Sequence, residues 1–143
     1  MLHKSLAAAL VLAASAAVPA VPAAAATAAS QGYAPGRQDA NRLVITVADS
    51  GTSADGTYEL TCRPAGGEHP DPAAACAALE RQAEPFAAVA ADAMCTYVYG
   101  GSATATIKGV WDGKAVDARF DRTDGCEIAR WDALVPALPE IGA

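Results

Sequence analysis

The stretch that decides the fold is ATATIKGVWDGKAVDARFDR, residues 103–122. Its two halves, 103–111 and 114–122, alternate apolar with polar side chains as half-buried strands do, and Asp112-Gly113 joins them. A two-residue Asp-Gly link between such runs is a strong hairpin signal, because both linking residues must adopt a positive φ. The sequence therefore predicts an antiparallel hairpin. Its apolar face would come from Ile107, Trp111, Val116, Ala118 and Phe120.

Two further strands are expected upstream of this hairpin. Residues 43–47 form the β-branched run Leu-Val-Ile-Thr-Val, and residues 58–62 alternate as Tyr-Glu-Leu-Thr-Cys. Between them, residues 49–56 are rich in Ser, Thr, Asp and Gly, which is typical of a turn. These runs add at least two strands to the predicted sheet.

The first helix is expected to begin at Asp71-Pro72, where an N-cap residue precedes a Pro in the first helical position. It would continue through Glu80, and Pro85 would break or restart it. Phe86 and Val89 are three residues apart, which predicts one or two further helical turns after that Pro.

The second helix is expected near the C-terminus, with Asp124 as its cap and its end before Pro136. It would contain Cys126, Ile128 and Trp131. The predicted fold class is therefore α+β, an antiparallel β-sheet of about four or five strands with two short helices.

The N-terminus reads as a cleaved secretory signal peptide. A positively charged start is followed by the apolar run Leu6–Val18 and then by small residues that fit an A-x-A cleavage rule. Pro19 and Pro22 interrupt the segment before it reaches the length of a transmembrane anchor. We predict removal of residues 1–28, with the cleavage boundary between 20 and 29.

The rest of the chain is predicted to be extracellular, without membrane attachment after cleavage. Residues 29–41 would form a flexible arm and residues 42–143 one domain. The chain carries a formal net charge of −6. That charge argues against nucleic acid and anionic membranes as partners, because both attract clustered Lys and Arg.

Four cysteines in an exported chain of this size indicate two disulfides. Three pairings are possible, and we favour Cys62–Cys76 with Cys95–Cys126 because these close the most local loops. A metal site is not expected, since no C-x-x-C is present and His69 is the single His left after signal removal.

Motifs of catalysis are missing from the sequence. His69 lies among Pro and Gly residues, which is typical of an exposed loop His without a catalytic role. The Gly pairs 66–67 and 100–101 lack the Lys and the strand–helix context of a phosphate-binding loop. We therefore expect no enzyme and no cofactor.

The stretch Met-Cys-Thr-Tyr-Val-Tyr-Gly-Gly, residues 94–101, allows two interpretations. One is an interior strand that buries Met94 and Val98 beside a cystine. The other is an exposed, extended loop that is tethered at Cys95 and displays Tyr97. The residues alone do not decide between them.

Over the region from Tyr33 to Glu127, the chain resembles the secreted subtilisin inhibitor-like family of actinobacteria, the Streptomyces subtilisin inhibitor type. The resemblance rests on the four Cys intervals and on the Gly-Val-Trp-x-Gly-Lys hairpin, residues 109–114. Further matching residues are Tyr33-Ala34-Pro35, Leu43–Val47, Leu60-Thr61-Cys62, Pro64, His69-Pro70, Ala75-Cys76, Leu79, Met94-Cys95, Val98-Tyr99, Val116 and Cys126-Glu127.

The resemblance implies a five-stranded antiparallel sheet with two helices, disulfides from first to second and third to fourth Cys, and a homodimer formed by packed sheets. It also implies a secreted inhibitor of subtilisin- and chymotrypsin-like serine endopeptidases, with Tyr97–Val98 as the reactive bond. The neighbouring protease-binding residues would be Met94, Cys95, Thr96, Tyr99 and Gly100. The alternatives are a secreted non-inhibitory binding or structural module on the same fold and, less favoured, a small exported hydrolase.

One departure from the family pattern concerns residues 100–101, which are Gly-Gly where the family commonly has Asp-Pro. Gly in an extended loop has more conformational freedom to lose on binding. Replacement of the pair by Asp-Pro is therefore expected to tighten inhibition.

Overall fold

A computed structural model describes residues 39–142 of the chain. The signal peptide predicted at residues 1–28 and the arm at residues 29–38 lie outside the described residues. In chain order, the elements are η1 (Asp39–Asn41), β1 (Arg42–Ala48), β2 (Gly56–Thr61), β3 (Gly66–Gly67), α1 (Pro72–Glu80), β4 (Thr104–Trp111), β5 (Lys114–Phe120) and α2 (Gly125–Ala133).

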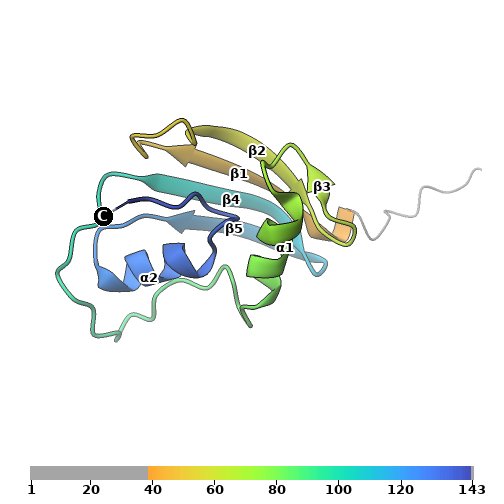
Figure 1. Cartoon of the computed structure of the whole chain (residues 1–143). Helices are drawn as coiled ribbons and strands as arrows, with labels where there is room; N and C mark the ends of the chain where they lie inside the picture. The colour runs from red at the N-terminus through yellow and green to blue at the C-terminus, as the bar shows by residue number, and fades with distance from the viewer. Residues whose placement is uncertain (1–38, 143) are drawn as a thin grey trace, which may run out of the picture. The chain divides into compact units, whose positions relative to one another are not determined.

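The five strands form one antiparallel sheet in the order β3-β2-β1-β4-β5 (Figure 1). The predicted hairpin is confirmed as β4–β5, with Trp111 opposite Lys114. Asp112 has φ 49° and Gly113 has φ 74°, so both linking residues adopt the positive φ that this turn needs. The α+β class with two helices is likewise confirmed.

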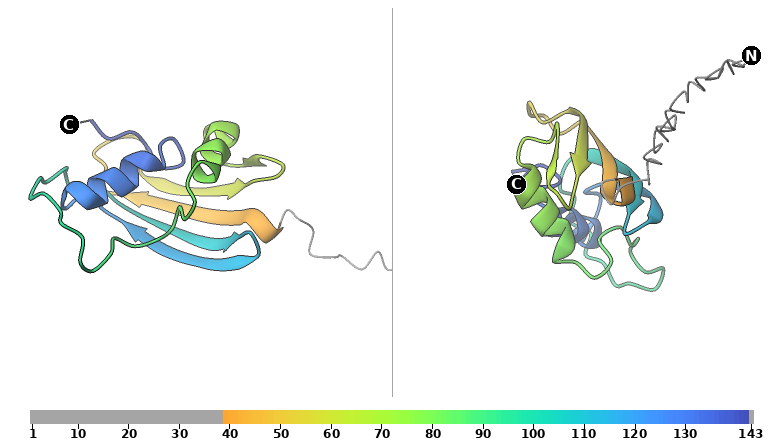
Figure 2. Two further views of the ribbon diagram at one scale, coloured as in Figure 1. Left: turned by 90° about the horizontal axis from the view of Figure 1, so that it is seen from below. Right: turned by 90° about the vertical axis from the view of Figure 1, so that its right-hand side faces the viewer.

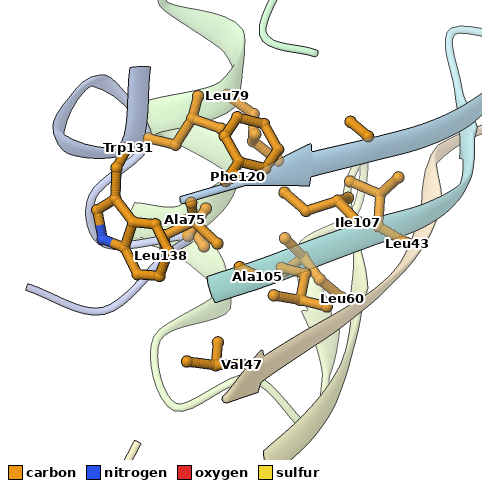
Figure 3. Close-up of a cluster of buried hydrophobic side chains, with 14 of the residues drawn as sticks. Leu43, Val47, Leu60, Ala75, Leu79, Ala105, Ile107, Phe120, Trp131 and Leu138 are labelled. Carbon is orange, nitrogen blue, oxygen red and sulfur yellow. The ribbon is translucent and has the colours of Figure 1, made fainter. Parts of the chain in front are cut away.

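Both helices cover the same face of the sheet (Figures 1 and 2). Along β1, exposed and buried residues alternate strictly, so that Leu43, Ile45 and Val47 point toward the helices. There they join Phe120 of β5 and Trp131 of α2, both of which are fully buried (Figure 3). The hydrophobic core therefore lies between the sheet and the helix layer.

Each helix begins where the sequence predicts. Asp71 caps α1 by accepting a hydrogen bond from Ala74 N at 3.1 Å. Asp124 caps α2 by accepting hydrogen bonds from Cys126 N at 2.8 Å and Glu127 N at 2.9 Å. These bonds satisfy N–H groups that the first helical turn leaves unpaired.

The prediction of further helical turns after Pro85 is wrong. Residues 81–103 contain turns and irregular backbone but no helix or strand. Phe86 instead packs edge-on against Trp111, with ring centroids 5.9 Å apart. Because Phe86 packs on a β4 residue, the segment after Pro85 follows an irregular course and does not continue as a helix.

The two predicted disulfides are present as Cys62–Cys76 and Cys95–Cys126. The first is buried and joins the end of β2 to α1. Within residues 39–142, no helix has the length and apolar character needed to cross a membrane.

The boundary of the predicted arm shifts, because residues 39–41 form η1 instead of irregular chain. Asn41 is buried, and its side-chain Oδ1 accepts hydrogen bonds from Asp112 N at 2.9 Å and Arg63 Nη2 at 3.1 Å. One side chain thereby holds the start of β1 to the β4–β5 turn.

Replacing Asn41 with Ala is expected to lower the free energy of unfolding by about 1–3 kcal/mol, because Asp112 N and the Arg63 guanidinium both lose the acceptor that the buried Asn41 side chain provides. Chemical denaturation measures the change. The matched control is Asp117→Ala, which removes an exposed ion pair with Lys108 and should cost about 1 kcal/mol at most. Equal losses in the two variants would contradict the role given to Asn41.

Candidate functional site

The most exposed apolar side chains of the described chain lie on the long connection between α1 and β4. Tyr97 is 105% exposed and Met94 98%, and Val98 and Tyr99 are also exposed. In Figure 1 this connection runs beside the N-terminal end of α2. The interior-strand interpretation of residues 94–101 is therefore wrong, and the exposed-loop interpretation is confirmed.

On the N-terminal side of Tyr97, the loop is fixed to the start of α2. The Cys95–Cys126 disulfide joins the two segments covalently. One residue further, Thr96 O accepts a hydrogen bond from Gly125 N at 3.0 Å. A Cβ at Gly125 would collide with Thr96 Oγ1, so the absence of a side chain at position 125 permits this close approach.

On the C-terminal side, Gly100 is fixed by both of its backbone polar groups. Its N–H donates to Arg122 O at 2.8 Å, and its carbonyl accepts from Arg122 Nε at 3.0 Å. A Cβ at Gly100 would lie 2.8 Å from Ile128 Cδ1. This side of the loop is therefore well anchored, contrary to the freedom that a Gly pair suggests.

Arg122 is the residue of this site that the sequence analysis missed. Its side chain is 6% exposed and its Nη1 lies 2.7 Å from Asp132 Oδ1 on α2. The sequence carries no motif around Arg122, because its partner Gly100 is 22 residues away and contributes only backbone atoms.

The turn that leads from β5 to Arg122 is fixed by Asp121. Burial of this carboxyl raises its pKa, but hydrogen bonds from the Thr123 hydroxyl and N–H and the charges of Arg119 and Arg130 lower it by more. The pKa of Asp121 therefore lies below its ordinary value, and the carboxylate stays ionised at neutral pH. It thus keeps both Thr123 hydrogen bonds, which are 2.6 and 3.0 Å long.

The structure does not bring His69 to this site, nor does it leave His69 exposed as the sequence analysis expected. His69 is buried, its Nδ1 accepts from Asp71 N at 3.1 Å, and its Nε2 lies 3.2 Å from Ala137 O. Both ring nitrogens are therefore committed to backbone groups, which is a structural role.

A possible set of metal ligands beside the loop comprises Cys95, Asp124 and Cys126. The two sulfurs are joined in a disulfide, so neither can act as a thiolate ligand.

The site therefore consists of three exposed residues, 97–99, between two anchors. The first anchor is the disulfide with the Thr96–Gly125 hydrogen bond, and the second is the Gly100–Arg122 pair. Such a segment presents peptide groups and two aromatic side chains to a partner, with its conformational freedom already reduced.

The sequence of the chain is similar to those of several known proteins. A family model described as "Subtilisin inhibitor-like" matches residues 39–123. Subtilisin inhibitor-like protein 1 of Streptomyces cacaoi is 34% identical over 108 residues, which cover 69% of this chain and 97% of that protein. Kexstatin-1 of Streptomyces platensis is 35% identical over 133 residues, 87% of this chain and 88% of that protein.

Among solved structures, Streptomyces caespitosus sermetstatin in complex with Bacillus licheniformis subtilisin is 28% identical, with a TM-score of 0.43. That match covers 68% of this chain and 98% of the other. The family model spans well over half of the described residues, and the S. cacaoi relative is matched over nearly its whole length. The chain belongs to the subtilisin inhibitor-like family, which consists of protease inhibitors and not of enzymes.

Proposed function

We propose that this protein is a secreted inhibitor of subtilisin- and chymotrypsin-type serine proteases, with Tyr97–Val98 as its reactive bond. The observation that carries the proposal is the full exposure of Tyr97 between two anchors on the same domain. A free, flexible loop with this sequence would be a substrate, whereas a loop held at both ends resists release after cleavage.

Inhibition would follow from imitation of a substrate. The extended segment enters the protease cleft and forms main-chain hydrogen bonds, as an added strand does. Tyr97 fills the primary specificity pocket as a buried aromatic anchor, and its carbonyl points into the oxyanion hole. Met94, Cys95 and Thr96 contact the protease before the reactive bond, and Tyr99 and Gly100 contact it after Val98.

The two anchors explain why cleavage of the Tyr97–Val98 bond by the protease would not release the inhibitor. When both ends stay in place, cleavage gains little conformational entropy, so religation competes with release of the fragments. Slow dissociation then gives a tight complex.

The test is a titration of subtilisin activity with the purified protein produced from the full chain. An inhibitor abolishes activity at a fixed stoichiometry and gives a tight complex on gel filtration. Unchanged protease activity at a large excess of the protein would identify the non-inhibitory module instead. Turnover of a substrate by the protein alone would identify a hydrolase.

We also propose export and dimerisation. Export predicts that protein recovered from the culture medium begins near residue 29, which N-terminal sequencing measures. A dimer would form through the sheet face opposite the helices, where Val44 is 41% exposed between Glu59 and Lys108. Sedimentation equilibrium of the protein and of Val44→Lys tests it. A monomeric parent protein would refute the dimer.

The Gly100-Gly101 pair leads to a prediction opposite to the one made from the sequence. Gly101 has φ 105°, which Pro cannot adopt, and a Cβ at Gly100 would lie 2.8 Å from Ile128 Cδ1, so the Ile128 side chain would have to move. Replacing the pair by Asp-Pro is therefore expected to weaken inhibition of subtilisin by about tenfold or more, since backbone strain of this kind costs about 1–3 kcal/mol.

The inhibition constant of the Asp-Pro variant provides the measurement. The matched control is Gly51→Ala, which introduces similar strain at φ 70° in the β1–β2 turn and should leave inhibition unchanged. Tighter inhibition by the Asp-Pro variant would show that the loop follows a different backbone course.

A further inference from the structure

Arg122 lies at the point where the loop, the end of β5 and helix α2 meet. Its guanidinium uses Nε for Gly100 O and Nη1 for Asp132 Oδ1, at 3.0 and 2.7 Å. The same guanidinium lies 5.9 Å from the centre of the Trp131 ring. With only 6% of its side chain exposed, its orientation is fixed from several sides.

Burying a guanidinium is costly unless its hydrogen bonds and its charge are satisfied. Asp132 supplies the opposite charge, and its own side chain remains 57% exposed, so the pair is only half withdrawn from water. The Arg122 Nε–H donates to the loop carbonyl of Gly100.

We infer that Arg122 is a positioning residue that holds the C-terminal side of the reactive bond in place after cleavage. This inference rests on the proposed function, because it assumes that Tyr97–Val98 is the bond attacked by the protease. The N-terminal fragment is retained covalently through Cys95–Cys126, whereas the segment after Val98 is retained next to the bond by Gly100–Arg122.

Helix α2 contributes one residue to each of the two anchors. Cys126 binds the N-terminal side, and Asp132, less than two turns further along, orients Arg122 for the C-terminal side. On cleavage, the Tyr97 carbonyl carbon is transferred to the protease serine oxygen, and the Val98 nitrogen leaves as an amine. In religation that amine attacks the ester carbon and displaces the serine oxygen, which regains its proton. Arg122 keeps the amine within reach for this step.

The test compares Arg122→Met with Arg130→Met in the full-length protein. Met keeps the apolar bulk of Arg and removes the side-chain hydrogen bonds to Gly100 O and Asp132 Oδ1, while the main-chain bond from Gly100 N to the carbonyl of residue 122 is kept. Arg130 is a suitable control because it also donates its Nε to a backbone carbonyl, that of Ala87, and pairs with Glu127, and these hydrogen-bond partners lie outside residues 94–101.

Each variant is incubated with subtilisin at equal concentrations, and hydrolysis at Tyr97–Val98 is followed by mass spectrometry. We expect Arg122→Met to inhibit at first and then to be hydrolysed about tenfold or more faster than the parent, which corresponds to loss of a charge-assisted hydrogen bond. Arg130→Met should be hydrolysed at the parent rate. Arg122→Lys, which retains a donor and the charge, should recover part of the resistance. Equal hydrolysis of Arg122→Met and the parent, or of both Met variants, would overturn the inference.

A second measurement does not depend on a protease. Hydrogen exchange of the Gly100 amide in the free protein should accelerate about tenfold in Arg122→Met and not in Arg130→Met. If the parent protein fails to inhibit subtilisin, the proposed function is wrong, while the exchange rates still decide whether Arg122 holds this segment. Unchanged exchange at Gly100 would refute that role on its own.

Discussion

Replacing Tyr97 by Lys is expected to convert the protein into an inhibitor of trypsin. The primary pocket of trypsin has an Asp at its base, and a bound Tyr leaves this buried carboxylate without a cationic partner. An unpaired buried charge costs about 3–5 kcal/mol, so Lys at position 97 should lower the inhibition constant for trypsin by about a hundredfold or more. Inhibition of chymotrypsin, whose pocket is apolar, should weaken in the same variant.

The control for this prediction is Tyr99→Lys. Tyr99 lies on the same exposed segment and is 68% exposed, but the proposed register places it outside the primary pocket. It should therefore not produce trypsin inhibition. The inhibition constants of both variants against trypsin and chymotrypsin show which of the two Tyr residues occupies the primary pocket. If Tyr99→Lys inhibits trypsin and Tyr97→Lys does not, the reactive bond has been assigned to the wrong residues.

The second large effect is expected on removal of the Cys95–Cys126 disulfide by the double replacement Cys95→Ala, Cys126→Ala. The bridge spans 31 residues, and loop-closure entropy assigns such a bridge a contribution of roughly 3.7 kcal/mol. Its loss frees the N-terminal side of the reactive bond, so subtilisin should cleave the variant and dissociate. We expect durable inhibition to become transient, which a time course of residual subtilisin activity records.

The Cys62–Cys76 disulfide offers an internal control, because it spans 14 residues and joins the end of β2 to α1 without involving residues 94–101. Its removal should lower stability by roughly 3 kcal/mol while the loop stays tethered. At a temperature where both double variants are folded, the Cys62→Ala, Cys76→Ala protein should remain a durable inhibitor. Identical time courses for the two variants would show that the tether acts only through global stability.

Most of the fold could be predicted from local sequence, because its elements carry their own signals. The Asp112-Gly113 turn imposes its positive φ values, Asp71 and Asp124 cap helices, and each signal involves neighbours in the chain. The segment after Pro85 could not be predicted in this way. Its course is set by packing of Phe86 on Trp111, a contact between residues far apart in sequence.

The candidate site likewise has one part that could be predicted from the sequence and one part that could not. The disulfide and the exposed Tyr97 follow from the Cys intervals together with the family resemblance, whereas Gly100–Arg122 depends on tertiary structure. Two adjacent Gly residues indicate freedom when only their intrinsic backbone preferences are considered. Here Gly100 is held in place, because its main-chain N–H and carbonyl both bond to Arg122 and its lack of a side chain permits close contact with Ile128.

The exposure of residues 97–99 has a consequence for the evolution of this protein's sequence. Their side chains are directed to solvent, so we expect substitutions there to have little effect on the folded state, and in the proposed register they would alter recognition of the protease. The residues that hold the segment, such as Cys126 and Arg122, lie on the scaffold and contact it from outside. Mutational drift in the three displayed positions is therefore nearly free of folding constraints. With the proposed reactive bond, we expect a lineage that carries this scaffold to follow a changing set of proteases through single substitutions, without rebuilding the domain.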